Sequence, residues 1–144
     1  YLRRVLDVAE TSDDTFRRHD AKHLLGIVGG VLEGELHRDT GDHTAAIAAF
    51  EQAVILEDEL TYDEPEPLPF SVRHWLGAAL LETGRYAEAE QVYRDELADH
   101  PHNGWSLFGL KTATEKQGTS FPEVDADLEA SWSRSDIWLR ASRF

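Results

Sequence analysis

The stretch SVRHWLGAALLETGRYAEAEQVYRDELADHP, residues 71–101, decides the fold of this 144-residue chain. Over residues 71–83, apolar side chains recur three and four positions apart, which predicts an amphipathic helix. Gly84 then marks a tight turn, because glycine accepts the left-handed backbone that ends a helix. A second helix is predicted over residues 86–99 and ends before Pro101, since proline lacks the backbone donor of a continuing helix. The stretch is therefore expected to form two antiparallel helices joined by a short turn.

The signature of this helix pair recurs on both sides of it. Gly118 lies thirty-four residues after Gly84, where a further repeat of the same length places its own turn. Upstream, one glycine pair and one alanine–aromatic pair return with unchanged internal spacing. The two matching sets are Gly34, Gly41, Ala46 and Phe50, and Gly77, Gly84, Ala89 and Tyr93. The turn glycines Gly41 and Gly84 are forty-three residues apart, so nine residues are inserted between these two repeats.

The inserted residues fall in a proline-rich segment, residues 59–70, whose three prolines exclude a helix and favour an extended path. We therefore divide the chain into a first repeat over residues 15–58, the insertion, a best-matched repeat over residues 71–101, and a partial repeat with a C-terminal cap over residues 104–144. All four parts are expected to belong to one domain, residues 1–144.

The flanking segments also show helical periodicity. Gly26, Gly30 and Gly34 form a bare stripe at four-residue spacing. Because each glycine costs about 1 kcal/mol against alanine in a helix, close approach of a second helix is the expected compensation. The alternative is that Gly29 and Gly30 break this helix in two. The helices predicted outside the best-matched repeat cover residues 2–9, 15–38, 104–117, 122–132 and 136–142.

Residues 34–118 resemble the tetratricopeptide repeat family. The residues that match its consensus in the best repeat are Leu76, Gly77, Gly84, Tyr86, Ala89, Tyr93, Leu97 and Pro101. Two positions depart from it, because Arg73 replaces an aromatic residue and Glu96 replaces an alanine. The resemblance implies an all-α fold: a right-handed solenoid of antiparallel helix–turn–helix units, with about two and a half to three repeats and capping helices.

The chain is also similar to the C-terminal end of long bacterial tetratricopeptide repeat proteins. The segments that carry this similarity are residues 62–65, 76–81, 103–110 and 141–144. Because the chain starts at Tyr1 within an apolar-periodic segment, we interpret it as a C-terminal fragment of a longer protein. The similarity implies a scaffold and a C-terminal position rather than an activity.

The charge of the chain limits its partners. With 28 acidic against 14 basic residues, the formal net charge is -14. Nucleic acid and anionic membrane surfaces both require a basic face, so neither is an expected partner. The longest apolar stretch, residues 24–32, has nine residues and is too short to cross a bilayer. We expect a soluble protein and favour the cytoplasm, while a targeting signal upstream of this sequence stays open.

No residue pattern in the sequence predicts catalysis or a cofactor. Cysteine is absent, which removes thiolate zinc sites and cysteine nucleophiles. No Gly-x-Ser-x-Gly elbow is present, and the glycine run at residues 26–30 lacks the lysine of a phosphate-binding loop. His19 and His23, at i and i+4 of a predicted helix, are weak metal candidates because no third ligand accompanies them. We therefore expect neither an enzyme nor a metal centre, and keep a histidine-based metal-binding accessory domain as an alternative.

The tetratricopeptide resemblance implies a partner-binding groove, because the first helix of each repeat lines the concave face in that family. The groove residues that this register implies are Arg38, His74, Ala78, Glu82, Trp105 and Phe108, with Val31, Glu35 and Thr112 beside them. Trp105 and Phe108 either anchor an apolar side chain of a partner or pack against the next helix. The expected function is protein or peptide binding by a scaffold, and the alternative is a homodimer formed through the capping aromatics Trp132 and Trp138.

Overall fold

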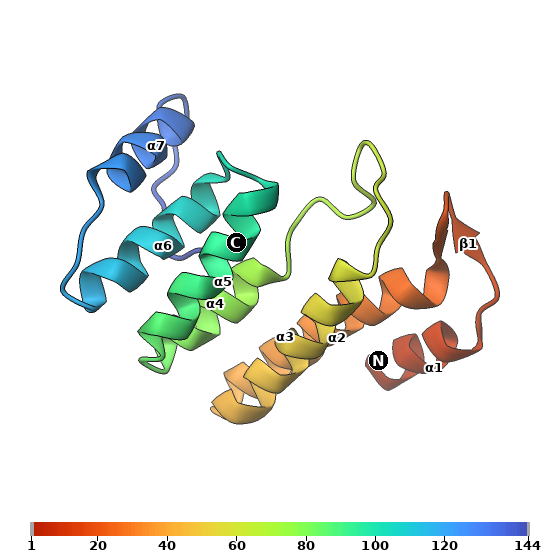
Figure 1. Cartoon of the computed structure of the whole chain (residues 1–144). Helices are drawn as coiled ribbons and strands as arrows, with labels where there is room; N and C mark the ends of the chain where they lie inside the picture. Colours follow the sequence, from red (N-terminus) through yellow and green to blue (C-terminus); the bar gives the residue numbers. More distant parts are fainter. Residues whose placement is uncertain (1, 144) are drawn as a thin grey trace. The chain divides into compact units, whose positions relative to one another are not determined.

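Helices make up almost all of the regular structure of this chain, as Figure 1 shows for the computed structural model. The structure describes residues 2–143, apart from the side chains of residues 2, 5, 6, 9 and 10. The described elements are α1 (Leu2–Thr11), β1 (Thr15–Phe16), β2 (His19–Asp20), α2 (Ala21–Asp39), α3 (His43–Asp58), α4 (Arg73–Glu82), α5 (Tyr86–Asp99), α6 (Gly104–Lys116) and α7 (Pro122–Trp132). The predicted all-α class is confirmed. The chain divides into unit 1, Tyr1–Val72, and unit 2, Arg73–Phe144, which are described in turn.

The centre of unit 1 is the antiparallel pair α2 and α3, which approach closely along the glycine stripe of α2. A methyl group added to Gly30 would stand 2.8 Å from Ala53 Cβ, and one added to Gly34 would stand 2.3 Å from the Phe50 ring. Helix α2 runs unbroken through these glycines, so the predicted close approach is confirmed and the alternative break at the double glycine is wrong. The turn to α3 uses Gly41 at φ +81°, a left-handed conformation that glycine adopts without strain.

The start of α2 differs from the prediction. The helix predicted over residues 15–38 begins only at Ala21, and the short antiparallel hairpin of β1 and β2 precedes it. Arg17 takes φ +58° in the hairpin turn, which a right-handed helix does not allow. Contacts between this turn and the proline-rich insertion explain the difference, because tertiary contacts override the helical preference of so short a segment.

The proline-rich insertion is tied to this hairpin. Arg17 donates to the Pro65 carbonyl at 2.5 Å and pairs with the Asp63 carboxylate at 3.0 Å. Arg18 lies 3.5 Å from the same carboxylate. Within the described residues 60–72 no helix or strand forms, as the three prolines predict. The insertion therefore gains its order from the hairpin and from Leu68 and Phe70, which pack on the core of unit 1, and not from secondary structure of its own.

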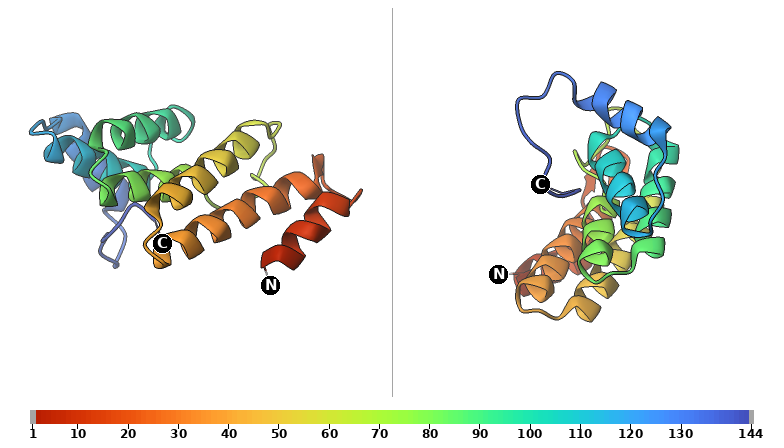
Figure 2. Two further views of the ribbon diagram at one scale, coloured as in Figure 1. Left: turned by 90° about the horizontal axis from the view of Figure 1, so that it is seen from below. Right: turned by 90° about the vertical axis from the view of Figure 1, so that its left-hand side faces the viewer.

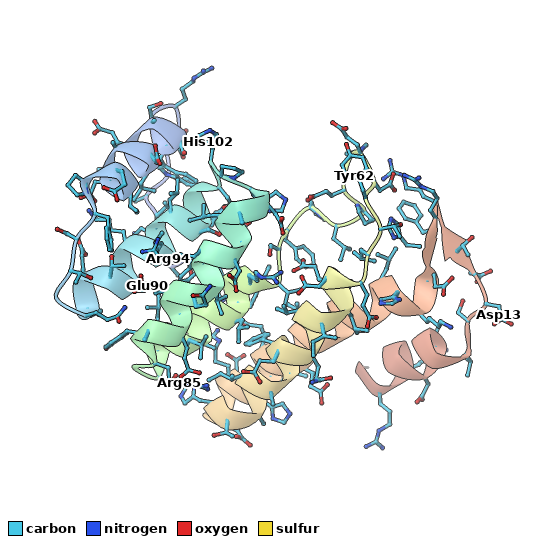
Figure 3. All side chains as sticks on the ribbon, in the orientation of Figure 1. Asp13, Tyr62, Arg85, Glu90, Arg94 and His102 are labelled. Carbon is cyan, nitrogen blue, oxygen red and sulfur yellow. The ribbon has the colours of Figure 1, made fainter. Side chains whose placement is uncertain are left out.

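Asp63 is expected to control how firmly the hairpin is held. Burial of Asp63 opposes the charge of its carboxyl group. The pKa of this carboxyl nevertheless lies below its ordinary value, because Arg17, a backbone hydrogen bond and Arg18 favour the charged form. Asp63→Ala should release the hairpin, so that trypsin cleaves after Arg17 and Arg18 several times faster, because local opening exposes the backbone to the protease. Asp13→Ala, at an exposed position ahead of the hairpin (Figure 3), is the matched control. An unchanged cleavage rate for Asp63→Ala would contradict this role.

In unit 2, helices α4 to α7 pack in chain order, and one tyrosine lies among the first three of them. Tyr93 of α5 is fully buried, and its ring lies against two glycines on neighbouring helices. A methyl group added to Gly77 of α4 would stand 2.3 Å from the ring, and one added to Gly109 of α6 would stand 2.2 Å from it. The turns after α4 and α6 use Gly84 and Gly118 at φ +76° and +78°, which confirms both predicted turn glycines.

The end of unit 2 departs from the prediction. Helix α7 has its predicted bounds, but the final helix predicted over residues 136–142 is wrong, because residues 133–143 form no helix. The Ile137 carbonyl accepts a hydrogen bond from the Trp132 indole N–H at 2.8 Å, and the Ile137 backbone N–H donates to the Ser135 hydroxyl at 3.3 Å. These local bonds engage backbone groups that a helix would use. We call residues 133–143 the C-terminal tail.

Candidate partner-binding surfaces

Helix α2 exposes a row of apolar side chains. Val28 and Leu32 are each 40% exposed and Leu36 is 49% exposed. Because these residues recur at four-residue spacing, they lie on one side of the helix. Single exposed apolar side chains are common on proteins, whereas a contiguous row marks a candidate interaction surface. We call these three residues the α2 stripe.

The α2 stripe lies next to the residues that the sequence assigned to a groove. Val31 is half-buried and packs against the core of unit 1. Glu35 and Arg38 pair with each other at 2.9 Å, so their charges are largely matched within the helix. The exposed apolar surface is therefore one helix position away from the predicted one. The sequence does contain a signal for this surface. Once the apolar residues of the buried face of α2 are assigned, further apolar residues remain on the same helix.

The other predicted groove residues lie on α4 and α6 of unit 2. They range from buried (His74, Ala78) through half-buried (Trp105, Phe108) to exposed (Glu82). Trp105 meets Trp132 of α7 edge to face, with ring centroids 5.4 Å apart, an arrangement that aromatic pairs prefer. A partner contact at the six groove positions stays a prediction.

A buried polar cluster lies around His74. Glu96 of α5 is 1% exposed, and its Oε1 lies 3.7 Å from His74 Nε2 and 3.0 Å from His100 Nδ1. The Asn103 amide donates to the same oxygen at 3.1 Å, while its carbonyl oxygen caps the start of α6. Because a buried charge is tolerated only with polar partners, this cluster ties α4 and α5 to the start of α6.

The cluster keeps Glu96 ionised. Burial by itself raises the pKa of the carboxyl, because the charged form loses its hydration. The side chains of His74 and Ser106, together with the charges of His74 and His100, outweigh burial and lower the pKa of Glu96 below its ordinary value. The sequence marked Glu96 only as a departure from an alanine consensus. His100 lies four residues further along at the end of the same helix, whereas His74 and Ser106 belong to α4 and α6, which sequence spacing does not connect to Glu96.

The two histidines considered for a metal do not share a helix face. His19 belongs to β2 and lies 3.5 Å from Asp63, while His23 belongs to α2 and lies 3.0 Å from Glu59. The predicted pairing at i and i+4 is therefore wrong, because α2 starts after His19. Among the side chains that the structure describes, no group of three or more histidine, aspartate or glutamate residues is placed to hold a metal ion.

Helix α5 and the turn before it carry charged pairs at their surface. Arg94 pairs with Glu90 at 2.7 Å, and Arg85 at the preceding turn pairs with Glu88 at 2.5 Å; three of these four residues are labelled in Figure 3. Pairs of this spacing contribute only about 0.3–0.5 kcal/mol each and are typical of a solvent-facing helix surface.

None of the helices in the described part of the chain has the length and apolar character needed to cross a bilayer.

The recurring unit of this chain is a helix pair with a glycine turn and an aromatic ring packed on a glycine. Phe50 packs on Gly34 in unit 1, and Tyr93 packs on Gly77 in unit 2. A model of the family described as Tetratricopeptide repeat matches residues 31–104, just over half of the chain. Comparisons with curated proteins and with solved structures gave no match. The chain belongs to the tetratricopeptide repeat family.

Proposed function

We propose that this chain is a non-catalytic module that binds a partner protein, and that the α2 stripe contacts that partner. Tetratricopeptide repeats generally mediate protein–protein interaction, which supports a scaffold role. The observation that carries the proposal is the row of exposed Val28, Leu32 and Leu36 on the first helix of a repeat. The role needs no cofactor, because hydrophobic contact alone supplies the driving force.

The gain from covering the stripe supports weak, specific contact rather than obligate assembly. Fully burying a valine or leucine side chain contributes about 1.5–3 kcal/mol, so three half-exposed side chains contribute roughly 3 kcal/mol in total. This free energy is only a part of what a standard protein–protein interface needs for stable binding. Since the chain carries a net charge of -14, a partner segment with apolar side chains flanked by lysine or arginine is favoured.

Charge introduced into the stripe is expected to weaken partner binding strongly. In Leu32→Glu and Leu36→Glu, the partner would have to bury a carboxylate without a counter-charge, and we expect captured partner to fall tenfold or more, about 1.4 kcal/mol. Ile55→Glu is the matched control, because Ile55 is an apolar residue of α3 with 50% exposure. The variants should keep the helical circular dichroism of the wild type. Equal capture by all of them would contradict the α2 stripe as the binding surface.

The predicted groove of unit 2 is a second candidate surface. Glu82 is exposed on α4, and Phe108 is half-buried on α6. Glu82→Lys reverses the charge at the exposed end of α4, so a loss of partner capture by this variant, with its helical circular dichroism unchanged, would support the groove.

Self-association through the aromatic end of the chain is the alternative function. Trp132 already packs on Trp105 within unit 2, whereas Trp138 of the tail is 89% exposed. Trp138 is therefore the residue that favours a homodimer. A chain that sediments as a monomer at micromolar concentration would exclude this alternative.

A further inference from the structure

The outer end of the proline-rich insertion is held in place through its main chain. The Tyr62 carbonyl accepts a hydrogen bond from Arg18 at 2.9 Å. The Pro65 carbonyl accepts one from Arg17 at 2.5 Å. Figure 2 (left) shows the insertion, in yellow to yellow-green, beside the hairpin, in red-orange. Because these bonds use carbonyl oxygens, they fix the path of the chain without engaging the side chain of Tyr62.

Tyr62 presents an aromatic ring at this outer end of the insertion, where Figure 3 labels it. The residue is 79% exposed, yet its hydroxyl donates a hydrogen bond to Glu64 Oε2 at 2.6 Å. This bond raises the pKa of Tyr62, so the phenol stays protonated and keeps its carboxylate partner. The ring is therefore held at its polar end, while most of its surface is open to solvent.

A ring that is already ordered is well suited to contact a partner. Ordering a mobile side chain costs free energy of binding, whereas the hydrogen bonds of Tyr62 restrict it in the free chain. Tyrosine is also enriched among the residues that contribute most to protein interfaces. The hairpin adds a second exposed ring, Phe16 of β1, with 54% exposure. Two segments joined by hydrogen bonds therefore each expose an aromatic residue, which marks a candidate interaction surface.

The charges at this surface favour a cation. Arg17 and Arg18 are both paired with the Asp63 carboxylate. Glu64, in contrast, is exposed, and its carboxylate lies beside the Tyr62 hydroxyl. A guanidinium group stacks on an aromatic face and pairs with a carboxylate through its planar N–H groups, whereas an ammonium group lacks the planar surface. An exposed ring next to a carboxylate therefore matches arginine better than lysine.

We propose that the outer end of the proline-rich insertion binds an arginine side chain of a partner protein, with the guanidinium stacked on the Tyr62 ring and paired with the Glu64 carboxylate. The net charge of -14 attracts such a partner. Because the insertion interrupts the repeat spacing, this site lies outside the helix pairs of the repeat. It is also separate from the α2 stripe, so it goes beyond the proposed function and does not depend on it.

Two peptides of equal charge test the proposal. A fluorescein-labelled peptide of three Gly-Ser-Arg units and one of three Gly-Ser-Lys units are each titrated with the full chain and followed by anisotropy. Neither peptide has apolar side chains, so neither reports on the α2 stripe. We expect the arginine peptide to bind about two- to fivefold more tightly, the effect of one exposed cation–π contact. Equal binding of the two peptides would overturn the proposal.

Variants of the chain test whether this preference arises at the insertion. Tyr62→Ala should bind the two peptides equally, because it removes the ring. Glu64→Gln should weaken binding of the arginine peptide about two- to threefold, because glutamine keeps the hydrogen bond to Tyr62 but not the charge. Asp13→Asn removes one charge at an exposed position ahead of the hairpin and should bind like the wild type.

Trypsin cleavage after Arg17 and Arg18 shows whether the insertion is still held in these variants. The rate should equal that of the wild type, because the bonds to the hairpin use carbonyl groups that the substitutions retain. If Tyr62→Ala keeps both this rate and the full preference for the arginine peptide, the arginine site does not lie at Tyr62 and the proposal is wrong.

Discussion

Glu96→Ala is expected to lower the free energy of unfolding of unit 2 by about 3 kcal/mol. The substitution restores the residue that the family consensus favours, so consensus alone predicts a neutral or stabilising effect. In this chain it removes the acceptor that faces His74, His100 and Asn103, and leaves their polar groups in a buried site. Groups of this kind cost free energy when they lose their partners.

Tryptophan fluorescence reads this effect in unit 2 alone. All four tryptophans of the chain, at positions 75, 105, 132 and 138, belong to unit 2. Urea titration of Glu96→Ala should therefore show a lower midpoint of the fluorescence transition. Glu90→Ala removes a half-buried carboxylate of the same helix, which pairs with Arg94 and accepts a hydrogen bond from Gln117, and should cost about 1 kcal/mol. If the two variants lose equal stability, the buried cluster does not have the role assigned to it.

The contribution of the Glu96 charge should also fade in acid. The pKa of Glu96 is lower in the folded chain than its ordinary value of 4.5. A carboxyl group whose pKa is depressed by folding stabilises the folded state. This stabilisation is fully present when the pH is above the pKa of the unfolded state, and it is lost as the pH falls through the pKa of the folded state. The stability difference between the wild type and Glu96→Gln should therefore shrink between about pH 5 and pH 3. A difference that stays constant over this range would contradict the depressed pKa.

Tyr93→Ala is expected to cost unit 2 about 3–5 kcal/mol, the usual range for deleting a large buried ring. The ring fills the space above Gly77 and Gly109, so its loss leaves a cavity where three helices meet. Tyr93→Phe keeps the ring and removes only the hydroxyl bonded to Ser142, and should cost about 1 kcal/mol. Urea titration followed by tryptophan fluorescence separates the two variants. Similar losses for both would show that the hydroxyl, and not the ring, is the main contribution.

The repeat itself was predictable because its signals are local. Glycines at φ +76° and +78° end α4 and α6 where the thirty-four-residue spacing placed them, and α5 has the bounds predicted from its apolar period and Pro101. The close approach of α2 and α3 followed from the free-energy cost of three glycines on one helix face. In each case the residues that decide the structure lie within one helix pair.

The features that the sequence did not predict depend on contacts between distant residues. The hairpin before α2 is held by Arg17 and Asp63, which are far apart along the chain. The tail is anchored by Ser142 on Tyr93 of α5. No periodicity connects such pairs. Residues 15–20 and 136–142 were therefore predicted as helix from their local sequence, although their tertiary contacts hold them in other conformations. For the candidate site, the family register named positions on α2, α4 and α6, which stay predictions. The exposed row of α2 runs beside them, with Leu32 next to Val31 and Leu36 next to Glu35.

Site-specific photo-crosslinking tests the central claim, that the α2 stripe contacts a partner protein. A photoreactive phenylalanine analogue replaces Leu32 in one chain and Ile55, with comparable exposure, in another. After irradiation in cell extract, we expect a discrete crosslinked protein from position 32, absent from position 55 and lost when Leu36→Glu is added. Crosslinks of equal yield at both positions, or a product from position 32 that survives Leu36→Glu, would contradict the account.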